Sequence, residues 1–303
     1  MRIGLTGGAA TADKLIEQAQ KAEADGFTSL WYASIVQGDP LVSMALAGRA
    51  TQRIELGTAV LQTYPCHPVL QARRAASVVA AMGRPGFTLG VGPSHEANIR
   101  QHYGMSYDRP AKNTEEYLAI LGAVLRDEAV DVDGEEWSAH LDAGATPLAH
   151  PVPVLVAALA PRMLRAAGAL GDGAILWIAP VAAIERMAAV VRESAAEAGR
   201  PAPRIVSGLP VVVHDDLDEA RAAVAHTATF YEHHANYQRV LKSGGAAGAV
   251  DAAIIGNEAT VRRGIERVIE AGATDFWANI VPAGNDRSGS MRRTTDLLRE
   301  LIG

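Results

Sequence analysis

Short runs of apolar, often β-branched residues alternate along the chain with longer alanine-rich segments of helical periodicity. Residues 54–61 are a strand-like run, whereas residues 11–26 are helical in pattern and place Leu15, Ala19 and Ala22 on one face. Such alternation predicts βα units around a parallel sheet. The predicted strands are residues 3–7, 29–33, 54–61, 87–92, 152–158, 174–178, 205–213 and 274–281.

Helical segments follow each predicted strand, and two of the connections are long. After the fourth strand come two helical segments and then residues 130–141, where Asp133-Gly134 indicates a small hairpin. After the seventh strand, residues 217–252 are expected to form a helix, an excursion loop and a return. The predicted helices are residues 11–26, 41–50, 67–82, 96–102, 112–125, 162–170, 181–198, 258–272 and 288–302, with one more inside 217–252.

Eight strands with eight helical blocks favour a closed (β/α)8 TIM barrel over an open doubly wound sheet. No GxGxxG motif follows any predicted strand, which argues against a dinucleotide-binding Rossmann fold. Barrels of this kind often exceed about 250 residues as one unit. We therefore expect one domain over residues 1–303, with excursions after strands four and seven.

Composition argues against some classes of partner and indicates the cellular compartment. The net charge of −6 and the lack of a basic stretch argue against nucleic acid. The single cysteine, Cys66, allows no internal disulfide, so a reducing cytoplasm is expected. No apolar run approaches the roughly 18 residues that a membrane span requires. The N-terminus also lacks the pattern of a signal peptide.

The chemistry of a TIM barrel is carried by residues just after the C-terminal ends of its strands. Here these residues are apolar and weakly charged, without clustered carboxylates or a GxSxG motif, so glycosidase, di-metal and serine hydrolase sites are not expected. His233-His234 could suggest a metal site, but adjacent helical residues point about 100° apart. We interpret the pair as solvated helix surface and predict no metal. Cys66 is expected to be a small buried filler rather than a nucleophile.

Several motifs occur in a specific order along nearly the whole chain. They are Ile-Glu-Leu-Gly-Thr-Ala-Val-Leu at 54–61 with His67-Pro68, Leu-Gly-Val-Gly at 89–92, Val-Pro-Val-Leu-Val-Ala-Ala at 152–158 with Pro161, and Gly-Asp-Gly at 171–173. This ordered set resembles the luciferase-like monooxygenase superfamily. Within it the chain is similar to the branch that uses the deazaflavin coenzyme F420. The resemblance implies a TIM-barrel oxidoreductase.

The resemblance also implies where the coenzyme lies. A non-prolyl cis peptide at Ala59-Val60 would form a bulge behind the deazaflavin ring. The coenzyme phosphate would lie near Leu159 and Ala160, where a helix N-terminus favours an anion; relatives often have two glycines there. Arg162 and Arg165 either add charge or face water. The coenzyme-binding residues so implied are Ala59, Val60, Gly92, Ser94, Asn98, Ala158, Leu159, Ala160 and Trp177.

The catalytic residues differ from those of sugar-phosphate-oxidising relatives, which carry Asp-His where this chain has Ser34-Ile35. His95 takes the place of an acidic residue in those relatives and is a candidate general acid or base. The alternative is that His95 caps a helix or hydrogen-bonds the coenzyme. Ser34 is the second catalytic candidate, as a proton relay. His67 is expected to be structural, at the start of a helix.

The substrate is expected to be small and mostly apolar, because the cations that would hold a sugar phosphate have no clear match. Five aromatic residues either line its pocket or pack the barrel: Trp31, Tyr32, Tyr64, Trp177 and Trp277. The resulting hypothesis is hydride transfer between F420 and a ketone, alcohol or activated alkene.

Two alternatives remain open at this point. One is an FMN-dependent monooxygenase that acts with a separate reductase. The other is a barrel that binds the coenzyme as a carrier or sensor without catalysis, because the Asp-His pair is missing. The resemblance further implies a homodimer that pairs through helices near strands two and three.

Overall fold

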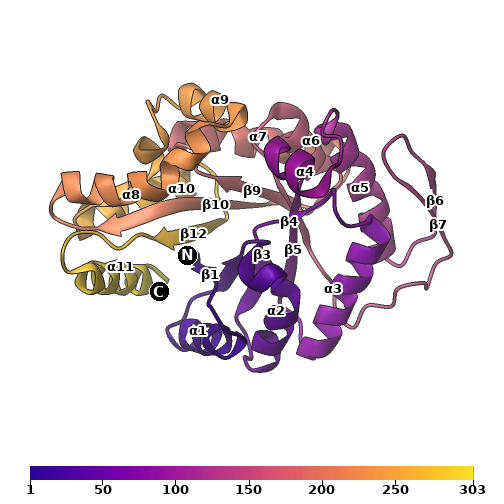
Figure 1. Ribbon diagram of the computed structural model, residues 1–303, viewed down its shortest axis with the longest axis horizontal. Coiled ribbons are helices and arrows are strands. Elements are labelled where there is room, and N and C mark those ends of the chain that lie inside the picture. The colour runs from indigo at the N-terminus through magenta and orange to yellow at the C-terminus, as the bar shows by residue number, and fades with distance from the viewer. Residues whose placement is uncertain (303) are drawn as a thin grey trace.

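A ring of parallel strands surrounded by helices forms the molecule in the computed structural model, which describes residues 1–302 (Figure 1). Each strand pairs in parallel with the next, and pairing of the last strand with the first closes the barrel. The expected (β/α)8 barrel is confirmed. Its strands are β1 (Arg2–Gly7), β2 (Ser29–Tyr32), β3 (Glu55–Thr58), β5 (Phe87–Gly92), β8 (Val154–Ala157), β9 (Gly173–Trp177), β10 (Arg204–Val213) and β12 (Asp275–Ile280).

The helices begin where the sequence supplies caps and prolines. Thr11 caps the first helix by accepting a hydrogen bond from the Lys14 N–H, and the His67 ring accepts one from the Val69 N–H beside Pro68. His67 is thus structural, as expected. The helices are α1 (Ala12–Ala24), α2 (Pro40–Arg49), α3 (Pro68–Met82), α4 (Glu96–Tyr103), α5 (Pro110–Leu125), α6 (Pro161–Ala169), α7 (Val181–Glu197), α8 (Leu217–Glu232), α9 (Ala235–Ser243), α10 (Glu258–Glu270) and α11 (Arg287–Ile302), with 3-10 turns η1 (Val36–Gly38) and η2 (Ala249–Ala252).

The predicted third strand is interrupted in its middle. Gly57 pairs with Thr88, and the next pair joins Leu61 of β4 (Leu61–Gln62) to Val91, so three residues oppose two on β5. This is the arrangement of a β-bulge. The Ala59-Val60 peptide bond within it is cis, so the expectation of a non-prolyl cis bond is confirmed.

Both long connections contain the expected excursions. After β5, the chain forms α4, α5 and an antiparallel hairpin of β6 (Val130–Asp133) and β7 (Ser138–Leu141). After β10, the predicted loop is instead a second helix, α9, followed by η2 and the short strand β11 (Ile254–Gly256), which pairs with β10. Tyr237, Val240 and Leu241 form the buried side of α9, and this helical spacing stabilises a helix where we expected a loop.

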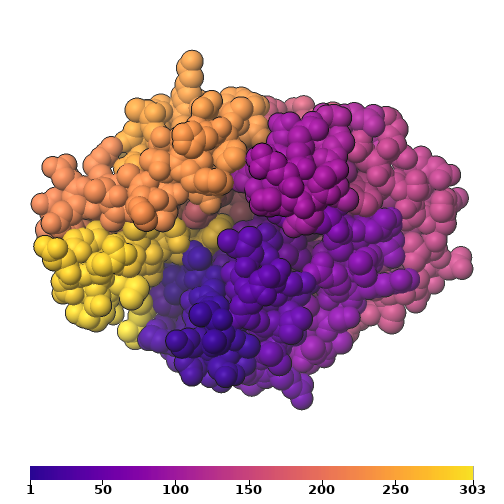
Figure 2. All heavy atoms as spheres, viewed as in Figure 1, coloured from indigo at the N-terminus to yellow at the C-terminus, as the bar shows by residue number. Residues whose placement is uncertain are grey.

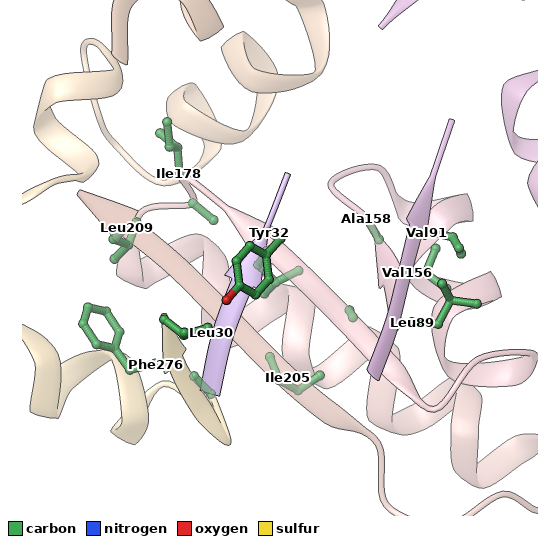
Figure 3. Close-up of a cluster of buried hydrophobic side chains, with 14 of the residues drawn as sticks. Leu30, Tyr32, Leu89, Val91, Val156, Ala158, Ile178, Ile205, Leu209 and Phe276 are labelled. Atoms are coloured by element: carbon green, nitrogen blue, oxygen red, sulfur yellow. The ribbon is translucent and has the colours of Figure 1, made fainter. Parts of the chain in front are cut away.

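The strands separate two apolar layers by alternation of their side chains. Trp31 belongs to the small cluster inside the barrel, together with Leu155 and Val206. Its neighbours Leu30 and Tyr32 belong to the larger cluster between barrel and helices. Figure 3 shows part of this outer layer, with side chains from several strands.

A network of charged side chains occupies the N-terminal ends of the strands, which we call the barrel base. Arg204 contacts Glu55 at 2.8 Å and Asp275 at 2.6 Å, and Arg2 contacts the same two carboxylates at 2.7 Å each. Burial alone would raise the pKa of Asp275, but hydrogen bonds and the charge of Arg204 outweigh it and lower that pKa. The strand ends are therefore joined by paired charges.

None of the helices in residues 1–302 combines the length and apolar character needed to cross a lipid bilayer.

Candidate functional site

A cavity of about 870 Å³ opens at the C-terminal ends of β3, β5, β8 and β9. The α4 segment and the junction of α8 and α9 border it, and these segments meet on the face seen in Figure 2. This is the end of a TIM barrel at which active sites lie. The cavity is lined by Val60, residues 92–97, Arg100, Gln101, Tyr107, residues 157–160, Met163, Ile175, Trp177 and residues 233–237.

The floor of the cavity is apolar and closely packed. A Cβ atom on Gly92 would lie 2.9 Å from the Ala157 Cβ and 3.1 Å from the Val60 Cγ2, so this position has no room for a side chain unless its neighbours shift. Val60 and Trp177 also pack against the aromatic cluster inside the barrel. Val60 is thus the bulge residue that lines the cavity, beside Gly92 and Ala157.

The N-terminus of α6 provides a place for an anionic group. Ala160 occupies the N-cap position but makes no side-chain capping hydrogen bond, and Pro161 follows it. The first N–H groups of a helix have no intrahelical partner, and the helix dipole favours negative charge there. Leu159, Ala160 and Met163 line the cavity at this end.

The two arginines near this helix end are not positioned as free charges in the cavity. Arg162 binds both carboxylate oxygens of Glu115, at 2.7 and 2.6 Å. Arg165 is exposed on α6, outside the cavity lining. Neither arginine therefore adds an unpaired positive charge to the cavity.

The loop after β5 is held by hydrogen bonds around Ser94. Ser94 has a left-handed backbone (φ 65°), which is uncommon for a residue other than glycine. The Gln62 amide donates to its hydroxyl at 3.1 Å, and the Tyr107 hydroxyl donates to its carbonyl at 2.7 Å. Tyr107 in turn stacks on Tyr64 with ring centroids 5.3 Å apart. These contacts fix the chain just before His95.

His95 borders the cavity from the N-cap position of α4. It makes no side-chain capping hydrogen bond, which argues against the helix-capping interpretation. Burial, and secondly the nearby His234, lowers the pKa of His95 from 6.5 to about 4. The imidazole is therefore neutral near pH 7.

The structure corrects our interpretation of the adjacent histidines. His233 is the C-cap of α8 and His234 the N-cap of α9, so the pair bridges two helices instead of lying on one. His233 is exposed, but the His234 ring stacks on His95 with centroids 4.0 Å apart and planes 14° apart. Because we missed α9, the sequence interpretation placed His234 in solvent, and that was wrong.

Most, but not all, of the predicted site residues line this cavity. Val60, Gly92, Ser94, Ala158, Leu159, Ala160 and Trp177 line it together with His95. Ser34, Ala59 and Asn98 are outside its lining, although Ala59 forms the bulge and Asn98 belongs to α4. Tyr107 and Tyr237 line the cavity and were not singled out from the sequence, and His234 lines it although we expected it in solvent.

The five aromatic candidates divide between cavity and core. Trp177 lines the cavity and stacks on Trp277 at 4.6 Å. Trp31 and Trp277 are buried inside the barrel. Tyr32 packs in the outer layer and Tyr64 is buried under Tyr107. Packing is thus the main role of four of the five.

Within residues 1–302, no three histidine, cysteine or acidic side chains converge in a way that could hold a metal ion. Cys66 is buried, 7% exposed, and lies 3.5 Å from the Arg74 guanidinium.

Two relatives with similar sequences carry descriptions of their activity. A 5,10-methylenetetrahydromethanopterin reductase from Methanolobus tindarius is 26% identical over 216 residues, covering 70% of this chain and 64% of that protein. A Mycobacterium tuberculosis protein described as a coenzyme F420-dependent oxidoreductase is 28% identical over 255 residues, covering 76% and 72% of the two chains. The chain thus spans somewhat under two thirds of the Methanolobus reductase.

Two solved structures share the fold over almost the full length of both chains. An F420-dependent secondary alcohol dehydrogenase in complex with an F420-acetone adduct has a TM-score of 0.77 at 19% identity, covering 98% of this chain and 97% of that one. The oxygenating constituent of 3,6-diketocamphane monooxygenase from Pseudomonas putida, in complex with FMN, has a TM-score of 0.71 at 18% identity, covering 100% and 97%. These likenesses confirm the barrel architecture.

The family model described as luciferase-like monooxygenase matches residues 1–281, which include every barrel strand and the whole cavity lining. The chain belongs to the luciferase-like monooxygenase family.

Proposed function

We propose that this protein is an oxidoreductase that transfers a hydride between coenzyme F420 and a small, mostly apolar substrate such as a ketone, an alcohol or an activated alkene. The observation that carries the proposal is one cavity with an apolar bulged floor, a helix N-terminus at one end and a neutral histidine in its wall. The names of both relatives described above denote redox enzymes, a reductase and an oxidoreductase, and the name of the second includes dependence on coenzyme F420.

The residues of the cavity fit such a coenzyme. Because Gly92 has no side chain, Val60 and Ala157 pack closely beside it, and a ring would lie against this floor and Trp177. The N–H groups at the start of α6, beyond Leu159 and Ala160, would bind its phosphate. When bound, the coenzyme supplies a ring carbon that gives or accepts the hydride.

His95 is the residue that we assign to the substrate oxygen. As a neutral imidazole it can donate an N–H hydrogen bond to a ketone oxygen or accept the hydroxyl proton of an alcohol. Ser34, at the C-terminal end of β2, is retained as a proposed proton relay, and Ala59 and Asn98 as proposed coenzyme contacts. Val60 and Trp177 would exclude water from the reacting carbon.

The charges around the cavity favour an uncharged substrate. Arg100 is the arginine of the cavity lining, and it is bound by Glu96 at 2.8 Å and by Asp108 at 2.6 Å. An anionic substrate would have to compete with both carboxylates for that guanidinium. A carbonyl or hydroxyl compound needs only the hydrogen bond from His95.

A binding titration tests the coenzyme. We expect purified protein to bind oxidised F420 with a micromolar dissociation constant and FMN more weakly, by calorimetry or fluorescence. Gly92→Val should weaken F420 binding because its side chain would collide with Ala157 and Val60. The exposed Asp133→Ala is the matched control at a distance from the cavity. Absence of F420 binding by the wild type would contradict the proposal.

A flavin-dependent monooxygenase is the second candidate, because an FMN complex shares the fold at a TM-score of 0.71. In that case FMN would bind more tightly than F420, and oxygen uptake would require a separate reductase. If F420 binds, a panel of secondary alcohols monitored by loss of the oxidised coenzyme absorbance then separates a catalyst from a carrier or sensor.

We also propose a homodimer through α2 and α3. Large apolar side chains are exposed there: Val42 is 69% exposed, Leu46 47% and Leu70 53%, and Ile35 beside η1 is 82% exposed. Exposed apolar patches of this kind mark interaction surfaces. Light scattering should give twice the mass of one chain, and Val42→Glu should shift the protein to monomer; a monomeric wild type would contradict the proposal.

A further inference from the structure

The excursion after β10 brings a second imidazole to the cavity wall that the reaction outlined above does not use. His234 is the N-cap of α9 but forms no side-chain capping hydrogen bond. Its ring lies face to face with that of His95, with centroids 4.0 Å apart. Two histidines from segments far apart in sequence therefore form one stacked unit beside the proposed reaction centre.

Aromatic neighbours restrict how this unit can move. Phe230 at the end of α8 meets both rings edge-on, at 5.1 Å from His234 and 6.0 Å from His95. Tyr237, one turn into α9, lies 6.2 Å from His95. Aromatic side chains of α8 and α9 thus border the stack, although Phe230 itself is 55% exposed.

The hydrogen bonding of His234 indicates that stacking determines its orientation. Among the residues that the structure describes, its Nε2 is buried and has no hydrogen-bond partner. Leaving a buried nitrogen without a partner is unfavourable, so other contacts must compensate. The contacts that remain are the face of His95, the edge-on ring of Phe230 and the tilted ring of Tyr237.

We propose that His234 is the positioning residue for His95: its stacked ring holds the His95 imidazole in one orientation at the cavity wall and shields one face of it from water. This inference rests on the proposed function for the importance of His95, but the contact itself is independent of which coenzyme binds. A sequence that lost α9 would lose the positioning residue with it.

The electrostatic surroundings agree with this arrangement. The titratable and charged groups that line the cavity with the pair are Glu96 and Arg100 on α4, Tyr107 in the following loop, and His233 and Tyr237 next to His234. Two effects lower the pKa of His95. The first is its burial, and the second is the charge of His234. Removing the His234 ring would remove its charge and the part of the burial that its stacked ring provides.

Ring-proton NMR across pH tests the proposal directly. The wild-type His95 resonance, identified by its loss in His95→Gln, should titrate well below 6.5. In His234→Ala its midpoint should rise by about one pH unit or more, because water reaches the uncovered face. In His234→Phe it should stay low, because a ring still covers His95. His226→Ala, an exposed histidine of α8, is the matched control and should leave the midpoint unchanged.

Turnover provides the second readout. With a substrate of the proposed class, kcat in His234→Ala should fall about tenfold, a part of the roughly 100- to 10,000-fold that a proton-transfer residue contributes, while the coenzyme dissociation constant stays the same. His234→Phe should recover most of that loss. An unchanged His95 midpoint in a folded His234→Ala protein would overturn the proposal. If F420 did not bind, the function would fail, but the titration would still decide the role of His234.

Discussion

The two ends of the barrel treat polar groups in opposite ways. At the barrel base, Arg2 and Arg204 each contact both Glu55 and Asp275, so every member of the network has a partner of opposite charge. At the mouth, His95 borders an open cavity without a capping bond, and the buried Nε2 of His234 has no partner within residues 1–302. The base can therefore stabilise the fold while the mouth keeps polar groups for a ligand.

The comparison explains why burial has different results in the two places. Asp275 is almost fully buried, yet its pKa is lowered because charged partners surround it. The pKa of His95 is lowered to about 4 for a different reason. Burial disfavours the charged form of the imidazole, and the nearby His234 disfavours it further. Asp275 thus remains charged whereas His95 remains neutral near pH 7.

The largest expected effect is on stability, from the base. Asp275→Ala should lower the free energy of unfolding by about 3 kcal/mol, the lower end for a buried ion pair, because Arg2 and Arg204 are partly exposed and keep Glu55 as a partner. Denaturant titration measures this. Asp133→Ala, whose side chain is 87% exposed in the hairpin, should change it by no more than about 0.5 kcal/mol. Equal losses for both variants would remove the distinction between base and surface.

The second effect should be on catalysis, from the mouth. His95→Ala should reduce kcat about 100-fold, equivalent to about 2.7 kcal/mol, because it removes the group assigned to the substrate oxygen. Its unfolding free energy should change much less than that of Asp275→Ala. Steady-state kinetics and denaturation of the same preparation test this, and full activity of the variant would refute the assignment.

Acid should separate the two ends by pH. His95 has a lower pKa in the folded state than in the unfolded one. Its contribution to the free energy of unfolding is therefore complete above pH 6.5 and is lost as the pH falls from there to about 4. Asp275 is lowered too, so its contribution is complete above its ordinary 3.8 and is lost below that. Stability curves of His95→Gln and Asp275→Asn should each lose only their own phase; coincident changes would contradict the separation.

The smallest effect is expected for Arg162 at the α6 end of the cavity. Arg162→Ala breaks its contacts with Glu115, but the arginine side chain is 53% exposed. Solvent-exposed pairs contribute about 1 kcal/mol or less. We expect a stability change of that size and little change in coenzyme affinity, measured by calorimetry, because the backbone of α6 rather than Arg162 is assigned to the phosphate. A large loss of affinity would reassign that contact.

Several features of the site could be predicted because they depend on local patterns. The order of strands, the hairpin at Asp133-Gly134 and the start of α6 at Pro161 follow from apolar periodicity, turn residues and helix-start signals. The bulge at Ala59-Val60 came from a resemblance to known proteins rather than from the residues alone. The helix α9 was not predicted, although Tyr237, Val240 and Leu241 have helical spacing, because nine residues give a short apolar pattern inside the long connection 217–252.

By itself, the amino-acid sequence determined the barrel, the apolar layers and the positions of the strand ends, because periodicity and turn chemistry act over a few residues. Only the tertiary structure decided which side chains meet. His95 and His234 are 139 positions apart, and Arg204 and Glu55 are 149 apart. Such contacts depend on closure of the ring and on the path of the excursions, and no local pattern encodes either.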